Sequence, residues 1–375
     1  MTERRVRRLL ERTPVDADAE ERGWEVVRAA FAEREPVRRR PRLRLALAVA
    51  VAGAAVVVAA ALSPPGRAVV DAVRRSIGIE HAQPALFHLP APGRLLVSGA
   101  GGSWVVAADG SKRRLGDYAQ ASWSPHGLYV VTATANELAA LAPDGRIHWT
   151  LARPQIRLPR WGGAHLDTRI AYLTSGRLHV VAGDGTGDAG VEGLPAAARV
   201  APVWNPAGGA LHLLAYVTNG GRVIVLDADR GSVQWISPAY AHPSALAWSQ
   251  NGRQLVLATA ARVVLFDART GRAKTLPVTG VRAVAFAPDG RLALLRPHAV
   301  LLRVHGRLRT LFVPPGGNAA GLAWSPDGRW LLTGLPAADE WVFLQTRGGR
   351  RILAVSHIVA QFGGFPSLDG WMPGA

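Results

Sequence analysis

The chain has 375 residues, 49% of them hydrophobic, and its 44 Lys and Arg against 27 Asp and Glu give a formal net charge of +17. The absence of cysteine excludes disulfides, thiolate metal sites and cysteine nucleophiles. Abundant Gly (41) and Pro (26) indicate many turns rather than long helices. After residue 44 the arginines are scattered singly, not clustered with aromatic residues, so we predict no nucleic-acid binding.

Residues 1–44 predict a short, Arg-rich helical head on the cytoplasmic side. Trp24, Val27, Ala30 and Phe31 recur at a spacing of three to four residues, which is typical of a narrow amphipathic stripe. Two interpretations remain open: a solvated head, or a small helix that binds a cytoplasmic protein partner.

Residues 45–62 form an apolar run that predicts a transmembrane helix. At 1.5 Å per residue the run would span roughly 27 Å, close to the hydrocarbon core of a bilayer. Five arginines directly precede it, which places the N-terminus in the cytoplasm and the rest of the chain outside. We therefore predict a single-pass protein of the cell membrane with an uncleaved signal anchor. A buried soluble helix and a cleaved signal peptide are the alternatives, although the run is long for a signal peptide.

Residues 63–85 predict a neck helix and linker. Val69, Val70, Val73 and Ile77 share one helical face, and Gly78 suits the end of that helix.

The remaining chain, residues 86–375, repeats one plan. An aromatic anchor precedes a polar turn and two apolar runs of strand length, with steps of 38, 43, 44, 38 and 38 residues between successive anchors. The anchors are Trp123, Trp161, Trp204, Trp248, Phe286 and Trp324. Four short antiparallel strands about every 40 residues form the unit of a β-propeller, so this region predicts an all-β propeller.

The two ends of the repeat region predict one shared blade. Residues 94–117 contain the second, third and fourth strands of a blade that lacks its first. In residues 366–375, Trp371-Met-Pro matches Trp324-Ser-Pro and predicts a seventh anchor. The sequence thus predicts seven blades, with the closing blade drawn from both segments; six blades are the alternative.

The "WSPDGR" element at Trp324 resembles the WD40-like repeat of the TolB-type propellers. This resemblance loosely covers residues 86–375 and implies the fold, not an activity. "VIVLDADRGSVQW", which ends at Trp235, also resembles a repeat of the quinoprotein-type propellers, and we interpret it as a general blade pattern. With the head and the apolar run, the layout is similar to membrane-anchored regulators of bacterial transcription factors.

Motifs that carry chemistry are sparse. The chain has no Gly-x-Ser-x-Gly, Walker-type or Gly-x-Gly-x-x-Gly motif. Asp184 and Asp188 in "AGDGTGDAG" are interpreted as turn residues, because Glu192 is misplaced for a calcium loop. Four histidines fall within strand-like runs and are interpreted as structural: His148, His179, His212 and His305. We predict no catalytic, metal or cofactor-binding residue and no cofactor.

These observations predict a membrane-anchored, extracytoplasmic propeller that binds or senses a protein or small ligand, or acts as a scaffold. The alternative is a lactonase-like or other hydrolase-like propeller enzyme outside the cell, and enzymatic activity is left uncertain. Buried acidic residues or histidines clustered at the ring axis would favour an enzyme, whereas an apolar or aromatic patch on one face would favour a binding module.

Overall fold

The computed structural model describes residues 79–82, 88–164, 167–207, 212–349 and 351–374. The chain divides into two compact units, Met1–Asp71 and Ala72–Ala375, and all described residues belong to the second. The predicted head, the apolar run and the neck helix therefore lie outside the described residues.

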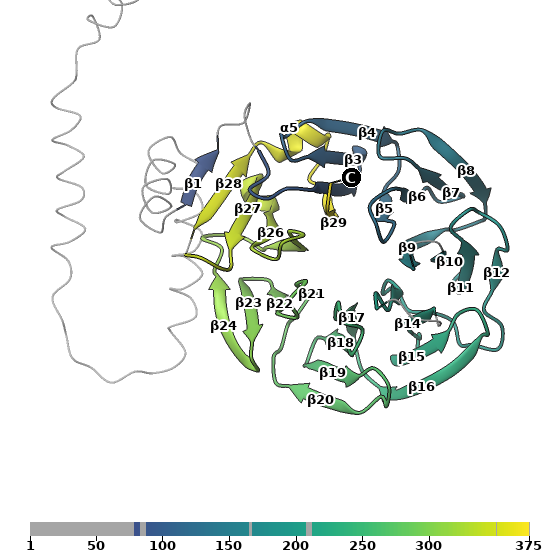
Figure 1. Ribbon diagram of the computed structural model, residues 1–375. Coiled ribbons are helices and arrows are strands. Elements are labelled where there is room, and N and C mark those ends of the chain that lie inside the picture. The colour runs from purple at the N-terminus through teal and green to yellow at the C-terminus, as the bar shows by residue number, and fades with distance from the viewer. Residues whose placement is uncertain (1–78, 83–87, 165–166, 208–211, 350, 375) are drawn as a thin grey trace, which may run out of the picture. The chain divides into compact units, whose positions relative to one another are not determined.

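The described strands form seven sheets arranged as the blades of a ring (Figure 1). Each blade has four antiparallel strands, the first nearest the ring axis. Blade 1 contains β29 (Ser367–Met372), β2 (Arg94–Gly99), β3 (Gly102–Ala107) and β4 (Lys112–Gly116). Blade 2 contains β5 (Gln120–Trp123), β6 (Val130–Ala133), β7 (Glu137–Leu141) and β8 (Ile147–Ala152). Blade 3 contains β9 (Arg157–Gly163), β10 (Thr168–Thr174), β11 (Arg177–Ala182) and β12 (Ala189–Gly190).

The remaining blades follow in chain order. Blade 4 contains β13 (Val203–Trp204), β14 (Leu213–Val217), β15 (Arg222–Asp227) and β16 (Ser232–Ala239). Blade 5 contains β17 (Pro243–Trp248), β18 (Gln254–Thr259), β19 (Val263–Asp267) and β20 (Ala273–Leu276). Blade 6 contains β21 (Ala283–Phe286), β22 (Leu292–Arg296), β23 (Ala299–Val304) and β24 (Arg307–Phe312). Blade 7 contains β25 (Ala320–Trp324), β26 (Trp330–Leu335), β27 (Glu340–Gln345) and β28 (Ile352–Ser356). The prediction of seven blades rather than six is confirmed.

Blade 7 carries a fifth strand at its outer edge. The short strand β1 (Ile79–Ala82) pairs in parallel with β28, with Ile79 opposite Ile352 (Figure 1). These four residues fall inside the segment predicted as neck and linker.

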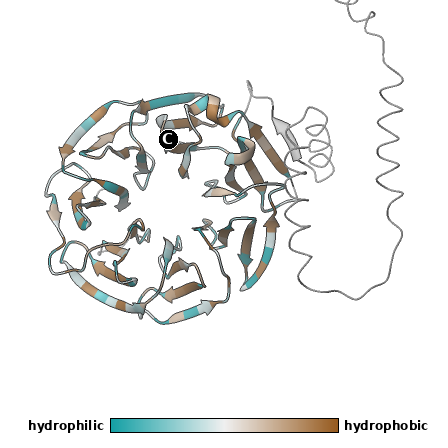
Figure 2. Cartoon of the chain, turned by 180° about the vertical axis from the view of Figure 1, so that it is seen from behind, coloured by the Kyte–Doolittle hydropathy of each residue, from teal (hydrophilic) through white to brown (hydrophobic). Residues whose placement is uncertain are grey.

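The hydrophobic core consists of layers between neighbouring blades. Second strands such as β6 and β26 are buried on both faces, and third strands such as β7 are mostly buried, because each blade packs against a neighbour on either side. Fourth strands are largely exposed, and Figure 2 shows hydrophilic residues mixed into this outer rim. This burial pattern explains why the middle strands have continuous apolar runs in the sequence.

Seven clusters of buried residues make up these layers, and each contains one anchor. Trp161, for example, belongs to a cluster with Val131 and Leu138 of blade 2, and Trp204 to a cluster with Ala171 and Leu173 of blade 3. All seven anchors are buried, with 5–8% of each residue exposed: Trp123, Trp161, Trp204, Trp248, Phe286, Trp324 and Trp371.

Blade 1 joins the two ends of the propeller. Strand β29 pairs antiparallel with β2, with Leu95 opposite Trp371, and β2 continues into β3 and β4. A first strand from the C-terminal end therefore completes a blade whose other three strands come from residues 94–116. With this pairing the ring has no open first or last blade.

The transmembrane part of the predicted fold is wrong by the structural criterion. A membrane span needs a helix of about 20 mostly apolar residues. No helix in the described ranges is long and apolar enough to cross a membrane. These ranges contain one short α-helix, α5 (Ile358–Phe362), and one 3-10 turn, η1 (Pro336–Ala338). The same finding argues against the predicted single-pass membrane location. The apolar run itself, residues 45–62, lies outside the described residues.

Candidate functional site

One face of the ring carries the hairpins between the first and second strands and between the third and fourth strands of each blade; we call it the hairpin face. Its first hairpins share a local design. In blade 2 the Ser124 hydroxyl, directly after the anchor, accepts a hydrogen bond of 2.9 Å from the Tyr129 backbone N–H. Ser249 and Ser325 make the same 2.9 Å bond in blades 5 and 7. The hydroxyl after the anchor therefore closes the turn and fixes the residues that follow its glycine.

Blade 2 departs from its sister blades at the residue after that glycine. Arginine occupies the position in three other blades, as Arg253, Arg291 and Arg329. In blade 2 it is Leu128, whose exposed fraction is 46%. The next residue, Tyr129, is 38% exposed, so this turn presents two large apolar side chains on the hairpin face.

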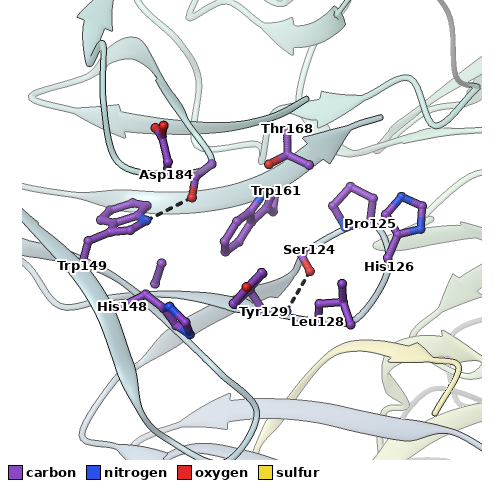
Figure 3. Close-up of a pocket in the computed structure, with 12 residues that line it drawn as sticks. Ser124, Pro125, His126, Leu128, Tyr129, His148, Trp149, Trp161, Thr168 and Asp184 are labelled. Carbon is purple, nitrogen blue, oxygen red and sulfur yellow. Dashed lines mark hydrogen bonds between the residues drawn. The ribbon is translucent and has the colours of Figure 1, made fainter. Parts of the chain in front are cut away.

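A groove of about 430 Å³ lies beside this turn, between blades 2 and 3 (Figure 3). We call it the aromatic groove. Blade 2 contributes Leu128, Tyr129, His148 and Trp149, and blade 3 contributes Trp161 and Asp184. Its volume is within the range of ordinary ligand and side-chain pockets.

Aromatic contacts hold the groove walls in place. The Tyr129 ring stacks on Trp161 with centroids 6.0 Å apart and meets His148 edge-on at 4.7 Å. The indole N–H of Trp149 donates a 3.0 Å hydrogen bond to the Gly183 carbonyl of blade 3 (Figure 3). Because these ring contacts and this hydrogen bond hold the two walls together, the groove is largely preformed. A preformed groove reduces the entropy that is lost when a partner binds.

Two exposed apolar side chains, Leu128 and Tyr129, line this groove, and a third lies next to a lining residue in the chain. Ile147, at the start of β8, is 53% exposed and directly precedes His148. Of the eight large apolar residues exposed in the described ranges, three belong to the two hairpins of blade 2 that border the groove: Leu128, Tyr129 and Ile147. An apolar patch beside a concave site is typical of a binding surface.

Apart from the aromatic groove, a pair of charged residues lies on the innermost strands: Asp369 in β29 and Arg160 in β9. Burial raises the pKa of Asp369 in β29 to about 7, while a hydrogen bond from Ser98 and the charge of Arg160 in β9 act in the opposite direction. The residue is partly exposed, yet its Oδ2 atom is buried and has no hydrogen-bond partner among the described residues. Burial also lowers the pKa of Arg160. This is one coupled pair, not a cluster of acids and histidines.

His212 links blades 3 and 4. Its Nδ1 lies 2.5 Å from Asp229 Oδ2, its Nε2 lies 3.0 Å from the Asp167 carbonyl, and Arg169 donates to Asp229 at 3.0 Å. Burial acts to lower the pKa of His212, but the hydrogen bonds to Asp229 and Asp167 outweigh it and raise that pKa above its usual value. The histidine has a structural role between two blades.

The other residues singled out in the sequence are dispersed. Asp184 accepts hydrogen bonds from the Thr186 N–H and hydroxyl, which is the geometry of a turn. Asp188 is bound by Arg153 at 2.8 Å and by the Tyr172 hydroxyl at 2.6 Å.

His305 does not lie within a strand: it occupies the turn between β23 and β24 with a positive φ of 47°. Within the described ranges no group of three or more His, Asp or Glu side chains could hold a metal ion.

Sequence reasoning placed the anchors but missed the aromatic groove. The anchors Trp123, Trp161, Trp204, Trp248, Phe286, Trp324 and Trp371 lie in the first strands of seven blades, and of these Trp161 alone lines the groove. A comparison of the repeats could have found the site, because Leu128 stands where sister blades have arginine. No repeat comparison could show that Trp149 and Tyr129 face the same space.

The architecture defines the chain as a β-propeller, and comparison with known proteins agrees. Residues 308–344 match the model of the WD40 family, "WD domain, G-beta repeat". This match begins in β24 and ends in β27, so it spans the boundary between blades 6 and 7. No curated protein matches the chain.

Several solved propellers are similar in structure. The β-propeller domain of Cps50 (Swd1) from Myceliophteria thermophila matches with a TM-score of 0.51 at 12% identity, covering 63% of this chain and 86% of that one. A chain of the mitotic checkpoint complex matches with a TM-score of 0.55 at 16% identity, covering 70% and 91%. KlHsv2 with its loop 6CD replaced by a Gly-Ser linker matches with a TM-score of 0.54 at 13% identity, covering 70% and 93%. At these identities the likeness shows the fold alone. A WD40-type propeller fits a protein-binding or scaffolding role.

Proposed function

We propose that this protein is a binding module that takes a segment of a partner protein into the aromatic groove. The observation that carries the proposal is a preformed groove lined by the exposed side chains of Leu128 and Tyr129, with the exposed Ile147 directly before the lining residue His148 in the chain. Burying these three side chains against a partner would remove apolar surface from water, the main favourable term in most protein association.

Charge indicates the chemistry of the partner. Residues 86–375 hold 28 Lys and Arg against 16 Asp and Glu. An acidic segment is therefore attracted to the propeller at long range, and its apolar or aromatic side chains supply the contacts within the groove. The partner we propose is an acidic protein segment with at least one large apolar side chain.

Site-specific photocrosslinking in the native host tests this proposal. A photoreactive phenylalanine analogue at Ile147 is expected to capture a protein through a segment of this composition. The same analogue at Val313, which is 59% exposed in a different blade, is the matched control. The captured protein is then purified and its affinity for the full chain is measured by calorimetry.

Charge substitutions in the groove complete the test. Leu128→Asp and Ile147→Asp are expected to weaken that purified complex by about tenfold or more, since central apolar contacts dominate most interfaces. Val313→Asp and Ile236→Asp, at apolar positions that are also exposed, should leave the affinity unchanged. All four variants alter exposed positions and should retain the melting temperature of the parent chain. Equal affinities for all four would overturn the proposal.

A further inference from the structure

The groove between blades 6 and 7 occupies the same kind of position on the hairpin face as the aromatic groove, but its lining is basic. It has a volume of about 410 Å³ and is bordered by the first hairpin of blade 6 and the last hairpins of blades 6 and 7. Four arginines line it: Arg291, Arg303, Arg309 and Arg347. The one carboxylate among the lining residues is Asp289. We call this groove between blades 6 and 7 the arginine pocket.

Arg291 is built into the pocket floor. The residue is only 8% exposed, its Nε donates to Asp289 Oδ2 at 2.8 Å, and its Nη2 donates to the Gly328 carbonyl of blade 7. Its guanidinium lies over the Trp324 ring, 5.0 Å from the centroid. These contacts hold a charged group in a fixed orientation at the junction of two blades.

Two guanidinium nitrogens of the pocket are buried without a partner. Neither Arg291 Nη1 nor Arg303 Nε has a hydrogen-bond partner among the described residues. A buried donor on a charged group is costly to leave unpaired, more so than a neutral one. An anion in the pocket can contact the exposed guanidinium groups of Arg309 and Arg347 directly, whereas these two buried nitrogens are closed to solvent and become available only if neighbouring side chains shift.

The carboxylate present does not neutralise the pocket. Asp289 is already held by Arg291 and by Arg347, whose Nη2 lies 2.5 Å from Asp289 Oδ2. Burial acts to raise the pKa of Asp289, but the hydrogen bond and charge of Arg291 keep it below its usual value. One negative charge therefore faces four permanent positive ones, because arginine does not lose its proton in proteins.

We propose that the arginine pocket binds a phosphoryl group as its dianion. Guanidinium groups match the oxygen geometry of phosphate, and a recessed site with several of them suits a compact group of charge −2 better than a single carboxylate. The site is separate from the aromatic groove, so the inference does not depend on the proposed function. The phosphoryl group could belong to free phosphate or to a phosphomonoester, and the two sources share this chemistry.

Calorimetric titration of the full chain tests the proposal, with inorganic phosphate and phenyl phosphate as probes at constant ionic strength and chloride as the reference salt. Binding of phosphate or of phenyl phosphate in excess of chloride is expected. Tight binding of inorganic phosphate alone identifies free phosphate as the ligand, whereas tighter binding of phenyl phosphate identifies a phosphomonoester.

Variants locate the binding. Arg303→Gln and Arg309→Gln are each expected to weaken it by about tenfold, the loss typical of one charged hydrogen bond. Arg272→Gln removes the same charge from an exposed hairpin position in blade 5 and should leave it unchanged. Arg291→Gln is less suitable alone, because it also removes the bond to Gly328 and can impair folding. If neither probe binds better than chloride, or if Arg272→Gln weakens binding as much as Arg309→Gln does, the proposal is wrong.

Discussion

Leu95 of β2 lies directly opposite Trp371 of β29, so residues 276 positions apart in the chain share one ladder of the closing blade. Trp371 also meets Phe343 of blade 7 edge-on, with ring centroids 5.9 Å apart. The last strand therefore connects the first blade to the seventh, and the closure of the ring depends on a few residues near the C-terminus.

Removing residues 366–375 should destabilise the whole propeller. The deletion eliminates β29, exposes the edge of β2 and removes Trp371 from the core shared with blade 7. Trp371→Ala alone should cost about 3–5 kcal/mol, the usual range for a buried tryptophan. Thermal unfolding of the deletion variant should occur at a much lower temperature than that of a chain ending at Pro373, which retains β29. Identical unfolding of the two shortened chains would show that β29, and with it the closure of blade 1, adds no stability.

His212 should make stability depend on pH above about 6.5. Its pKa is raised in the folded protein, so its contribution is fully present below the pKa of about 6.5 in the unfolded chain. That contribution is lost as the pH rises through the folded pKa. The groups that face the imidazole are Asp229 and Asp167, with Arg169 opposing them. In chemical denaturation, the free energy of unfolding of the parent chain should be lower at about pH 8.5 than at about pH 6. The His212→Asn variant should show a smaller difference between these two pH values. An equal decline in both proteins would exclude His212 as the cause.

Asp369 should cause a separate loss of stability, over a lower pH range than His212. Its pKa is about 7 in the folded protein, against about 3.9 in an unfolded chain, so the folded state binds the extra proton between these values. Stability should therefore fall as the pH rises from about 4 to 7 and then level off. Asp369→Asn mimics the protonated acid and should flatten the curve in that window. Asp117→Asn, at a side chain that is 87% exposed, should leave the curve unchanged.

Gly162 should tolerate no side chain. A Cβ atom at this position in β9 would overlap the side chain of Trp204, the anchor of the next blade. The indole of Trp204 is fixed there by a 2.9 Å hydrogen bond from Nε1 to the Arg160 carbonyl. Gly162→Ala should therefore destabilise the protein by about 1–3 kcal/mol, the cost typical of overpacking. Gly316→Ala is the control, because nothing lies within 4 Å of a Cβ there. A denaturant midpoint for Gly162→Ala equal to that of Gly316→Ala would contradict the expected clash.

The sequence by itself predicted the propeller architecture and favoured seven blades over six, and the seven sheets of the structure confirm that number. Both follow from periodicity: an aromatic anchor about every 40 residues is a local pattern, and each repeat encodes a sheet whose buried faces need neighbours. The prediction of a transmembrane helix rested on the length of the apolar run and on the arginines before it, and the described residues contain no helix of that kind.

Only the tertiary structure decided where binding chemistry gathers. Leu128 and Arg291 occupy the same repeat position, yet one borders an aromatic groove and the other a basic pocket. The difference depends on partners from the adjacent blade, such as Trp161 beside Tyr129 and Arg347 beside Asp289. Each groove is formed by two blades whose hairpins are dozens of residues apart in the chain. The sequence lists these side chains, but the curvature of the ring determines which of them share a space.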